Sequence, residues 1–437
     1  MRMILLLAAI AAFVGATFAG EILSPRDGAT VQLMPDAFRD FLRKDRAERI
    51  RLIASETSRE EMKRTFPANR PLGVKFAWTG GAGGSLKVWR KKDGAVFFEG
   101  RVVSNEHTLV NFEIARDYAW RVTTSEGEVL TASFRTEDLA PRLIDWPGIS
   151  NARDLGGRRG LGGRRVRQGL VYRNGGLNHN ASWQYFKAAE LADANARGTL
   201  AELLKDGIGQ EGERLDAEKV ARTIRKKEQS GDWTDGYCEI HYLKRGTFTP
   251  GEPLMTEATR QWALGTLGVK TEIDLRTFRE TAGMTGSPLG PTVKWCHYSA
   301  SNYEGMDTKA GRRTFAKCFR VFLDERNYPI DFHCIAGADR TGSLACILNG
   351  LLGVDEEELY RDWEMSWPKK MNGTAARQNH RRLFDKLIGV FGKYAGATLN
   401  ERIVQYVLSC GFGMDDIEKF RSIMLEGEPD RILVPGA

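Results

Sequence analysis

A ten-residue stretch from His333 to Gly342 carries the residue types that could do chemistry in this chain. Cys334 and Arg340 stand six residues apart within it, between the apolar runs 328–332 and 343–352. The first run predicts a buried strand and the second predicts a buried helix, so the stretch forms a loop that leads into a helix N-terminus. Backbone N–H groups and the helix dipole favour an anion at such a terminus.

The residue types in this loop suit attack on a phosphorus atom. The helix N-terminus and Arg340 favour the thiolate of Cys334, and a thiolate is a good nucleophile at neutral pH. A guanidinium binds two phosphate oxygens in a fork, while loop amides can surround the remaining oxygens and stabilise charge. The Thr341 hydroxyl could also donate a hydrogen bond to the Cys334 sulfur. The residues predicted to bind the anion beside Arg340 are Ile335, Ala336, Gly337, Ala338 and Thr341.

Asp339 lies next to Arg340 and is a candidate proton donor to the leaving oxygen. A carboxylate beside bound phosphate is expected to have a raised pKa because like charges repel, although Arg340 opposes that shift. The alternative is that Asp339 only orients Arg340. In that case the candidate acids are Asp274, Asp307 and Asp235.

The loop pattern, His-Cys-(five residues)-Arg-Thr-Gly, resembles the signature loop of the cysteine-dependent protein tyrosine phosphatase superfamily. The form with Asp directly before Arg340 is similar to that of bacterial tyrosine phosphatases that also act on phosphoinositides. Residues 151–157 together with 169–177 resemble the N-terminal motif pair of that group. Residues 267–276 with Glu280 resemble its central strand and turn. The resemblance extends from about residue 145 to about residue 430.

The resemblance implies a phosphomonoester hydrolase, most simply a protein tyrosine phosphatase, that works through a phosphocysteine intermediate. Cys334 would be the nucleophile, Arg340 would bind phosphate and Asp339 would be the acid, with His333, Asp274 and Arg276 as possible supporting residues. Phosphoinositides or inositol phosphates are the alternative substrates. No metal ion or organic cofactor is implied. The family often has Lys where this chain has Ala338, so one phosphate-binding cation is missing.

Each of these residues could instead have an ordinary structural role. A cysteine after an apolar strand is usually a small buried hydrophobe, and an Asp-Arg pair usually lies on the surface. A protein that binds phosphorylated ligands or mediates adhesion without turnover is therefore the competing class. The complete set of Cys334, Asp339 and Arg340 between a strand and a helix favours the enzyme.

The N-terminus has the pattern of a secretory signal peptide. Arg2 precedes an apolar run from Ile4 to Val14, and small residues near Ala16 and Ala19 suggest cleavage after Ala19. We therefore expect a periplasmic or extracellular protein without a membrane span, with a retained anchor as the alternative. The six cysteines would then enter an oxidising compartment, and their spacing predicts neither a disulfide framework nor a metal site.

Residues 21–140 predict an N-terminal β-sandwich whose partner the sequence does not identify. Apolar residues alternate in several short runs separated by Gly-rich turns, which is typical of such a fold. The segment from Tyr118 to Val122 resembles a strand of fibronectin type III domains. Residues 35–65 are an exception with loosely helical spacing, and residues 138–141 are expected to be a linker.

Residues 142–430 predict an α/β phosphatase domain with a central sheet flanked by helices and a helical C-terminus. Helical spacing is expected over 313–325, 356–367, 376–391, 399–409 and 414–425. Residues 190–250 are a predicted insertion, either a lid over the site or a surface excursion.

The composition is that of a globular protein, with 42% hydrophobic and 28% charged residues among 437. The net charge of +7 suits an anionic ligand but is equally compatible with a solvated surface. No basic stripe interleaved with aromatic residues is present, so nucleic acid is not an expected partner.

Overall fold

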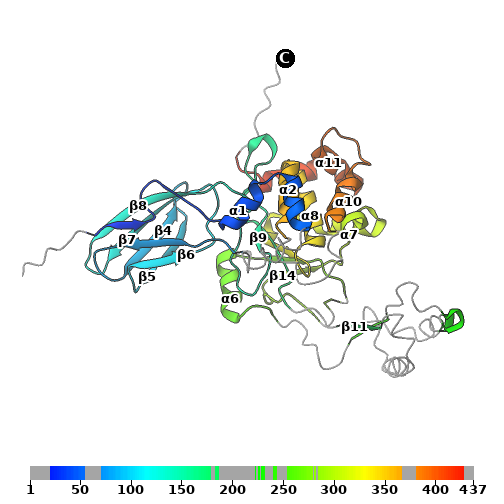
Figure 1. Cartoon of the computed structure of the whole chain (residues 1–437), viewed down its shortest axis with the longest axis horizontal. Coiled ribbons are helices and arrows are strands. Elements are labelled where there is room, and N and C mark those ends of the chain that lie inside the picture. The colour runs from blue at the N-terminus through cyan, green and yellow to red at the C-terminus, as the bar shows by residue number, and fades with distance from the viewer. Residues whose placement is uncertain are drawn as a thin grey trace, which may run out of the picture. The chain divides into compact units, whose positions relative to one another are not determined.

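The computed structural model describes residues 20–54, 70–178, 183–186, 222, 225–226, 228–231, 240–243, 253–278, 280–281, 284–366 and 380–427. The chain divides into two compact units (Figure 1). One comprises Met1–Leu33 with Leu72–Asp138, and the other comprises Met34–Pro71 with Leu139–Ala437. The predicted signal peptide lies outside the described residues, so export stays a prediction. Within the described part, no helix is long and apolar enough to cross a membrane.

The first unit is a β-sandwich. One sheet has the order β1 (Ile22–Ser24), β3 (Val74–Trp78), β6 (Glu106–Leu109), and the other has the order β2 (Ala29–Val31), β8 (Val129–Thr136), β7 (Asp117–Thr124), β4 (Gly84–Arg90), β5 (Val96–Val102). Phe76 of β3 packs against Trp120 of β7 and Phe134 of β8, with ring centroids 5.2 and 5.8 Å apart. All three rings are buried because alternate residues of a strand face the same side. The fibronectin likeness stays a prediction.

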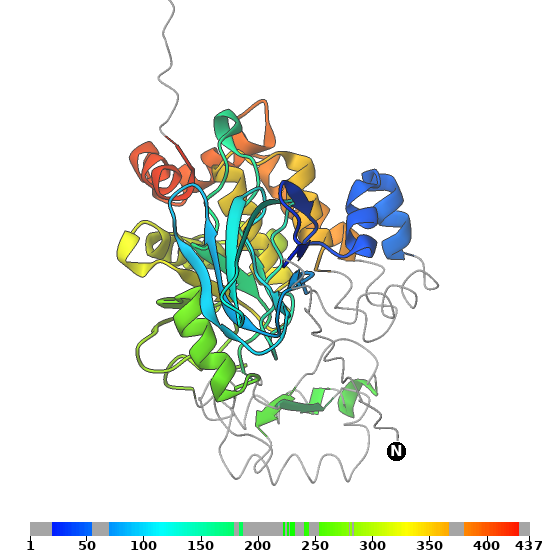
Figure 2. The same ribbon diagram turned by 90° about the vertical axis from the view of Figure 1, so that its left-hand side faces the viewer.

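The second unit is built on one mixed sheet, and Figure 2 shows helices of this unit in yellow, orange and red. Its order is β14 (Lys294–His297), β13 (Thr271–Asp274), β15 (Ile330–His333), β10 (Val171–Asn174), β9 (Arg153–Asp154), and only β9 is antiparallel to its neighbour. The register aligns His333 with Asp274 on one side and with Asn174 on the other. The carboxyl ends of three strands therefore meet at one edge of the sheet, which is where open α/β sheets place their ligand sites.

Helices cover both faces of this sheet. Ile273 and Phe332 point into a large core shared with α7 (Lys309–Phe322), α8 (Asp339–Leu351), α9 (Glu356–Glu364), α10 (His380–Phe391), α11 (Leu399–Ser409) and α12 (Met414–Met424). Tyr172 on the other face joins a smaller core with Ala263 and Leu267, which belong to η4 (Ala263–Leu267) after α6 (Glu257–Trp262). Shorter turns are η1 (Leu161–Gly163), η5 (Tyr303–Asp307) and η6 (Glu325–Asn327).

The described helices of the C-terminal region agree with the predicted ones to within a few residues at their ends. Helix α11 has the predicted bounds, and α12 ends one residue earlier than expected. Helix α7 begins at Lys309, four residues before the predicted start, because Thr308 accepts a hydrogen bond from the backbone of Gly311 and caps the helix there.

The predicted insertion leaves and rejoins the second unit at one place. Asn178 forms a β-bridge with Pro253, and further out β11 (Trp183–Phe186) pairs with β12 (Ile240–Leu243). Most of residues 190–250 lie outside the described part, so a lid over the site and a surface excursion both remain predictions for this insertion.

The structure differs from the sequence interpretation at helices α1 (Asp36–Arg43) and α2 (Arg46–Ala54), which were expected within the N-terminal module. They belong to the second unit. The apolar stripe of α1 packs against Leu143 and Met365. On α2, Arg49 is fully buried and pairs with Glu364 at 2.5 Å and with Glu357 at 2.7 Å. A cut near residue 142 would therefore expose part of the core of the second unit.

The Arg49 contact predicts a stability effect. Arg49→Met should lower the free energy of unfolding of the second unit by about 3–5 kcal/mol, because Glu364 would stay buried without its cation. Urea unfolding followed by tryptophan fluorescence measures the change. Arg326→Met is the matched control. Arg326 pairs with Asp324, but its side chain is 89% exposed, so the loss of this pair should lower the free energy of unfolding by less than about 1 kcal/mol. Equal effects of the two variants would contradict the docking of α2.

Candidate active site

The predicted loop connects β15 to α8 without interruption. Strand β15 ends at His333 and α8 begins at Asp339, so residues 334–338 form the turn between them. Gly337 has φ +65°, and a Cβ atom there would lie 2.3 Å from the carbonyl oxygen of Asn174. Both the left-handed backbone and this close approach require glycine.

The backbone of the loop is held from outside. Its carbonyl groups accept hydrogen bonds as follows: Ile335 from the N–H of Gly176 (2.9 Å), Ala336 from Asn151 Nδ2 (3.1 Å), and Gly337 from Asn151 Nδ2 (3.0 Å) and Arg173 Nη2 (2.7 Å). A trans peptide unit carries its N–H opposite its C=O. Outward carbonyls therefore turn the N–H groups of residues 336–338 inward, and these donors bond no other described residue. They are available to an anion.

Cys334 lies at the start of this loop and is only 2% exposed. Burial would raise the pKa of its thiol, but the Arg340 guanidinium, the Thr341 hydroxyl and the Thr341 N–H together hold that pKa below its usual range. The Thr341 hydroxyl is buried and hydrogen-bonds no other group in the part that the structure describes. The site thus favours a thiolate, as the sequence predicted.

Arg340 is fixed by Glu280, which comes from the segment after β13. Its Nη1 donates to Oε2 at 2.6 Å and its Nη2 donates to Oε1 at 3.0 Å, while the Leu275 carbonyl lies 3.3 Å from Nη1. Burial would raise the pKa of Glu280, but the bonds and charge of Arg340 lower it. The carboxylate therefore stays charged and orients the guanidinium toward the loop.

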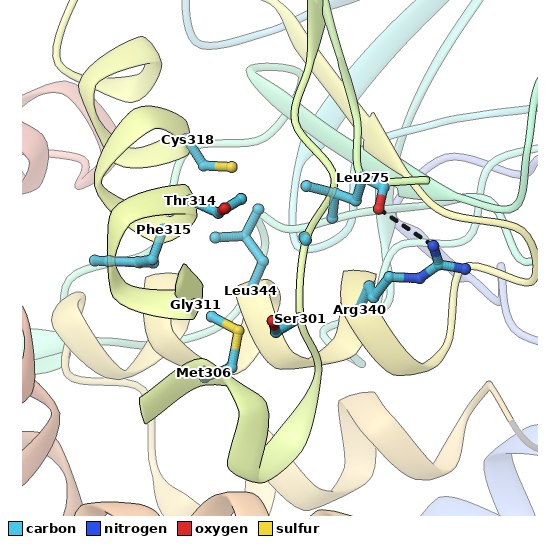
Figure 3. Close-up of a pocket in the computed structure, with 10 residues that line it drawn as sticks. Leu275, Ser301, Met306, Gly311, Thr314, Phe315, Cys318, Arg340 and Leu344 are labelled. Carbon is cyan, nitrogen blue, oxygen red and sulfur yellow. Dashed lines mark hydrogen bonds between the residues drawn. The ribbon is translucent and has the colours of Figure 1, made fainter. Parts of the chain in front are cut away.

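A small apolar pocket lies beside Arg340, which forms part of its wall (Figure 3). Met306, Phe315 and Leu344 line it, and Arg340 points away from them toward the Leu275 carbonyl. The cavity volume is about 10 Å³, room for about one water molecule. It is too small to receive a substrate ring.

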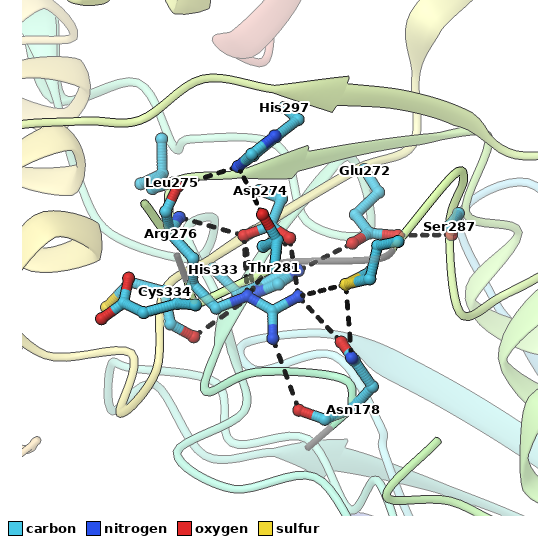
Figure 4. Close-up of polar contacts among 12 residues, drawn as sticks. Asn178, Glu272, Asp274, Leu275, Arg276, Thr281, Ser287, His297, His333 and Cys334 are labelled. Atoms are coloured by element: carbon cyan, nitrogen blue, oxygen red, sulfur yellow. Dashed lines mark hydrogen bonds and ion pairs between the residues drawn. The ribbon is translucent and has the colours of Figure 1, made fainter. Parts of the chain in front are cut away.

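A layer of buried charges lies behind the loop (Figure 4). His333 binds Glu272 at 2.8 Å, and Arg276 Nη2 donates to Asp274 at 2.6 Å. Burial would lower the pKa of His333, but Asp274 and Glu272 raise it to about 9, so the imidazole is protonated at neutral pH. Its Nδ1 lies 3.3 Å from the Cys334 carbonyl and holds the beginning of the loop.

The carboxylates of this layer have the spacing of metal ligands, since Glu272, Asp274 and His333 offer atoms within 4.8 Å of one another. Arg276 already binds both oxygens of Asp274, and His333 already binds Glu272. The contacts therefore favour two ion pairs. Of the residues that the resemblance gave as possible supporting ones, His333 contacts the loop at the Cys334 carbonyl, and Asp274 and Arg276 lie in the same buried layer, so the supporting role stays a prediction.

Asp339 is the first residue of α8, and its Oδ1 accepts a hydrogen bond from the Tyr303 hydroxyl. Two of the alternative acids are engaged elsewhere. Asp274 is buried against Arg276 and His333, which despite burial hold its pKa at about 2. Asp307 accepts from Arg312, Lys393 and Tyr394. The third, Asp235, lies outside the described residues. This comparison favours Asp339 as the acid.

The sequence interpretation missed the anchor that holds the loop scaffold. Asp362 of α9 accepts hydrogen bonds from Arg153, Arg158 and Arg173, and all four side chains are buried. Burial would raise the pKa of Asp362, but the three guanidinium groups lower it far below its usual range. Arg153 and Arg173 lie in the motif pair quoted above, where the resemblance gave them no role. No periodic pattern marks Asp362.

The sequence matches the tyrosine phosphatase family over residues 144–194 and 252–426, just over half of the 437 residues. The chain belongs to the tyrosine phosphatase family. The match leaves out residues 195–251, nearly the same stretch that the sequence interpretation described as an insertion.

Two individual proteins are similar to this family member. A tyrosine-protein phosphatase from Nostoc commune is 28% identical over 166 residues, which are 31% of this chain and 55% of that protein. The chain thus spans about half the length of that curated relative. The core catalytic domain of the PP-IP phosphatase SIW14 from S. cerevisiae, in complex with citrate, shares 17% identity over 32% of this chain and 83% of that chain, with a TM-score of 0.21.

The Cys334 environment predicts a change in thiol reactivity that is independent of turnover. Thr341→Val should move the pH midpoint of iodoacetamide alkylation at Cys334 to higher pH, because a donor to the thiolate is lost. Mass spectrometry of the Cys334 peptide measures the rate at each pH. Thr136→Val is the control and should leave the midpoint in place, because this buried threonine of β8 donates its hydroxyl to the Glu113 carbonyl in the first unit. An unchanged midpoint in Thr341→Val would contradict the assigned role of the hydroxyl.

Proposed function

We propose that this protein hydrolyses phosphomonoesters through a phosphocysteine intermediate. The observation that carries the proposal is the loop backbone, whose outward carbonyls leave a set of inward N–H donors around a low-pKa thiol. Such preorganised donors stabilise charge that develops in a transition state. Family membership supports the same reaction class.

In the first step the Cys334 sulfur attacks phosphorus and forms an S–P bond while the bond to the leaving oxygen breaks. Arg340 and the loop N–H groups hold the three phosphate oxygens. Asp339 gives a proton to the leaving oxygen, so an alcohol or phenol departs. In the second step Asp339 takes a proton from water, the resulting hydroxide attacks phosphorus, and the S–P bond breaks to release phosphate and the thiolate.

We propose protein phosphotyrosine as the substrate. The loop carries Ala338 where related loops often carry Lys, so Arg340 is the cation that the loop itself supplies. One guanidinium paired with Glu280 suits a single phosphate group better than a ring bearing several. Phosphoinositides or inositol phosphates are the second candidate, supported by the resemblance of the Asp-Arg loop. A non-catalytic phospho-ligand-binding protein is the competing class.

Turnover separates the enzyme from the binding protein. The wild-type chain should hydrolyse p-nitrophenyl phosphate, and Cys334→Ser should abolish release of phosphate because the nucleophile is gone. Rapid acid quench of the wild-type reaction should show phosphate bound to the Cys334 peptide by mass spectrometry. Phosphotyrosyl peptides, phosphoserine peptides, phosphoinositides and inositol phosphates then rank the substrates. Binding of phosphopeptide without any turnover would support the competing class instead.

The role of Asp339 predicts a dependence on the leaving group. Asp339→Asn should reduce kcat/KM by about 10²–10⁴-fold for an alkyl phosphate, whose alkoxide needs a proton, and by much less for p-nitrophenyl phosphate. Asp307→Asn is the matched control, since that carboxylate is bound by other partners. An equal loss on both substrates in Asp339→Asn would assign Asp339 to binding or structure.

A further inference from the structure

Tyr303 has an unusual backbone conformation beside the candidate site. Its φ is +49°, in the left-handed region that bulky residues rarely occupy, and the residue is only 5% exposed. Such conformations cost free energy and persist only where neighbouring contacts enforce them, often at functional sites. The sequence interpretation gave this residue no role.

Two hydrogen bonds connect Tyr303 to the first turn of α8. The N–H of Tyr303 donates to Ser343 Oγ at 3.1 Å, and the same Oγ donates to the Asp339 carbonyl at 2.9 Å. The Tyr303 hydroxyl donates to Asp339 Oδ1. Tyr303 is thus fixed to Asp339 at both its backbone and its side chain.

The phenol of Tyr303 acts as a permanent donor. Its pKa is raised far above 10, first by burial and then by the charge and hydrogen bond of Asp339. The charge of Cys334 contributes in the same direction. The hydroxyl therefore keeps its proton throughout catalysis and cannot itself be the acid.

We propose that Tyr303 is a positioning residue for the general acid, holding Asp339 Oδ1 so that the carboxyl group transfers its proton through Oδ2. The inference rests on the proposed function. The proton moves from Oδ2 to the leaving oxygen as the phosphorus–oxygen bond breaks, and a proton of water returns to Oδ2 as the sulfur–phosphorus bond is hydrolysed. The Tyr303 proton is not transferred. The strained backbone is what brings the hydroxyl to Oδ1.

Tyr303→Phe tests this, because it removes the hydroxyl and keeps the ring. The kcat/KM for an alkyl phosphate should fall about ten- to a hundredfold, as expected for a misplaced catalytic group, while the kcat/KM for p-nitrophenyl phosphate should change less than about twofold. The quantity kcat/KM reports the first chemical step even where hydrolysis of the phosphocysteine limits kcat. An unchanged inhibition constant for inorganic phosphate would show that binding at the loop is intact.

Tyr394→Phe is the matched control. Tyr394 also donates its hydroxyl to a carboxylate, at 2.8 Å, but that carboxylate is Asp307, the last residue of the same η5 turn. This variant should leave the ratio of the two substrates unchanged. In the Asp339→Asn background, Tyr303→Phe should cause no further loss on the alkyl phosphate, because both changes remove the same proton transfer.

Three outcomes would overturn the proposal: an equal loss on both substrates in Tyr303→Phe, an additive loss in the double variant, or an Asp339→Asn variant without leaving-group dependence. Thermal unfolding of Tyr303→Phe against Tyr394→Phe separates misfolding from misplacement. The proposed function is judged separately: it fails if the wild-type chain binds phosphopeptide without turnover, or if Cys334→Ser keeps the aryl phosphatase activity of the wild-type chain.

Discussion

The orientation of three peptide units in the loop after β15 is the constraint on which the rest of the site depends. A row of backbone N–H groups that face one common centre is unfavourable, because each is a strong donor that normally pairs in a folded chain. The arrangement persists because Asn151, Arg173 and Gly176 bind the carbonyls on the other side. These three residues lie about 160–185 positions before the loop in the sequence. The sheet brings them there, because β10 lies directly beside β15 in parallel register.

Four cations around the loop, among the residues that the structure describes, are paired with acids. Arg173 binds Asp362, His333 binds Glu272, Arg276 binds Asp274 and Arg340 binds Glu280. Buried pairs of this kind contribute little net stability, but losing one partner is costly, so they fix orientation. The pairing also limits the excess positive charge at the site. A loop that neutralises its own cations can lower the pKa of one thiol and hold one phosphate dianion without requiring a highly charged substrate.

The parts of the fold that were predicted from sequence are those with a local signal. The loop joins a contiguous strand and helix, and its Cys-to-Arg spacing lies within seven residues, so both position and chemistry could be inferred. Helix α11 and most of α12 follow from apolar periodicity alone. Asp362 could not be found this way, because its partners Arg153 and Arg173 are 209 and 189 residues away. Tyr303 could not be predicted either, because a left-handed backbone conformation at a tyrosine has no signal in the amino-acid sequence.

The prediction that α1 and α2 belong to the N-terminal module was wrong for a different reason. Chain order suggested one N-terminal module, yet these helices lie between β2 and β3 of the sandwich in sequence and pack in the second unit. An amphipathic helix must bury its apolar stripe, and the sequence does not say against which surface. The stripe of α1 meets Met365, which directly follows Glu364, and Glu364 holds Arg49 of α2.

Helix α9 therefore has two sets of neighbours. Glu364 and Glu357 face α2, whereas Asp362 faces the arginines that fix the loop carbonyls. Asp362 and Glu364 are two positions apart, and a helix moves as a rigid element over that distance. A shift of α2 that displaced the end of α9 would also displace Arg173 and the Gly337 carbonyl that it binds. A helical segment some 300 residues earlier in the chain therefore binds the same turn of α9 that holds the arginines of the loop scaffold.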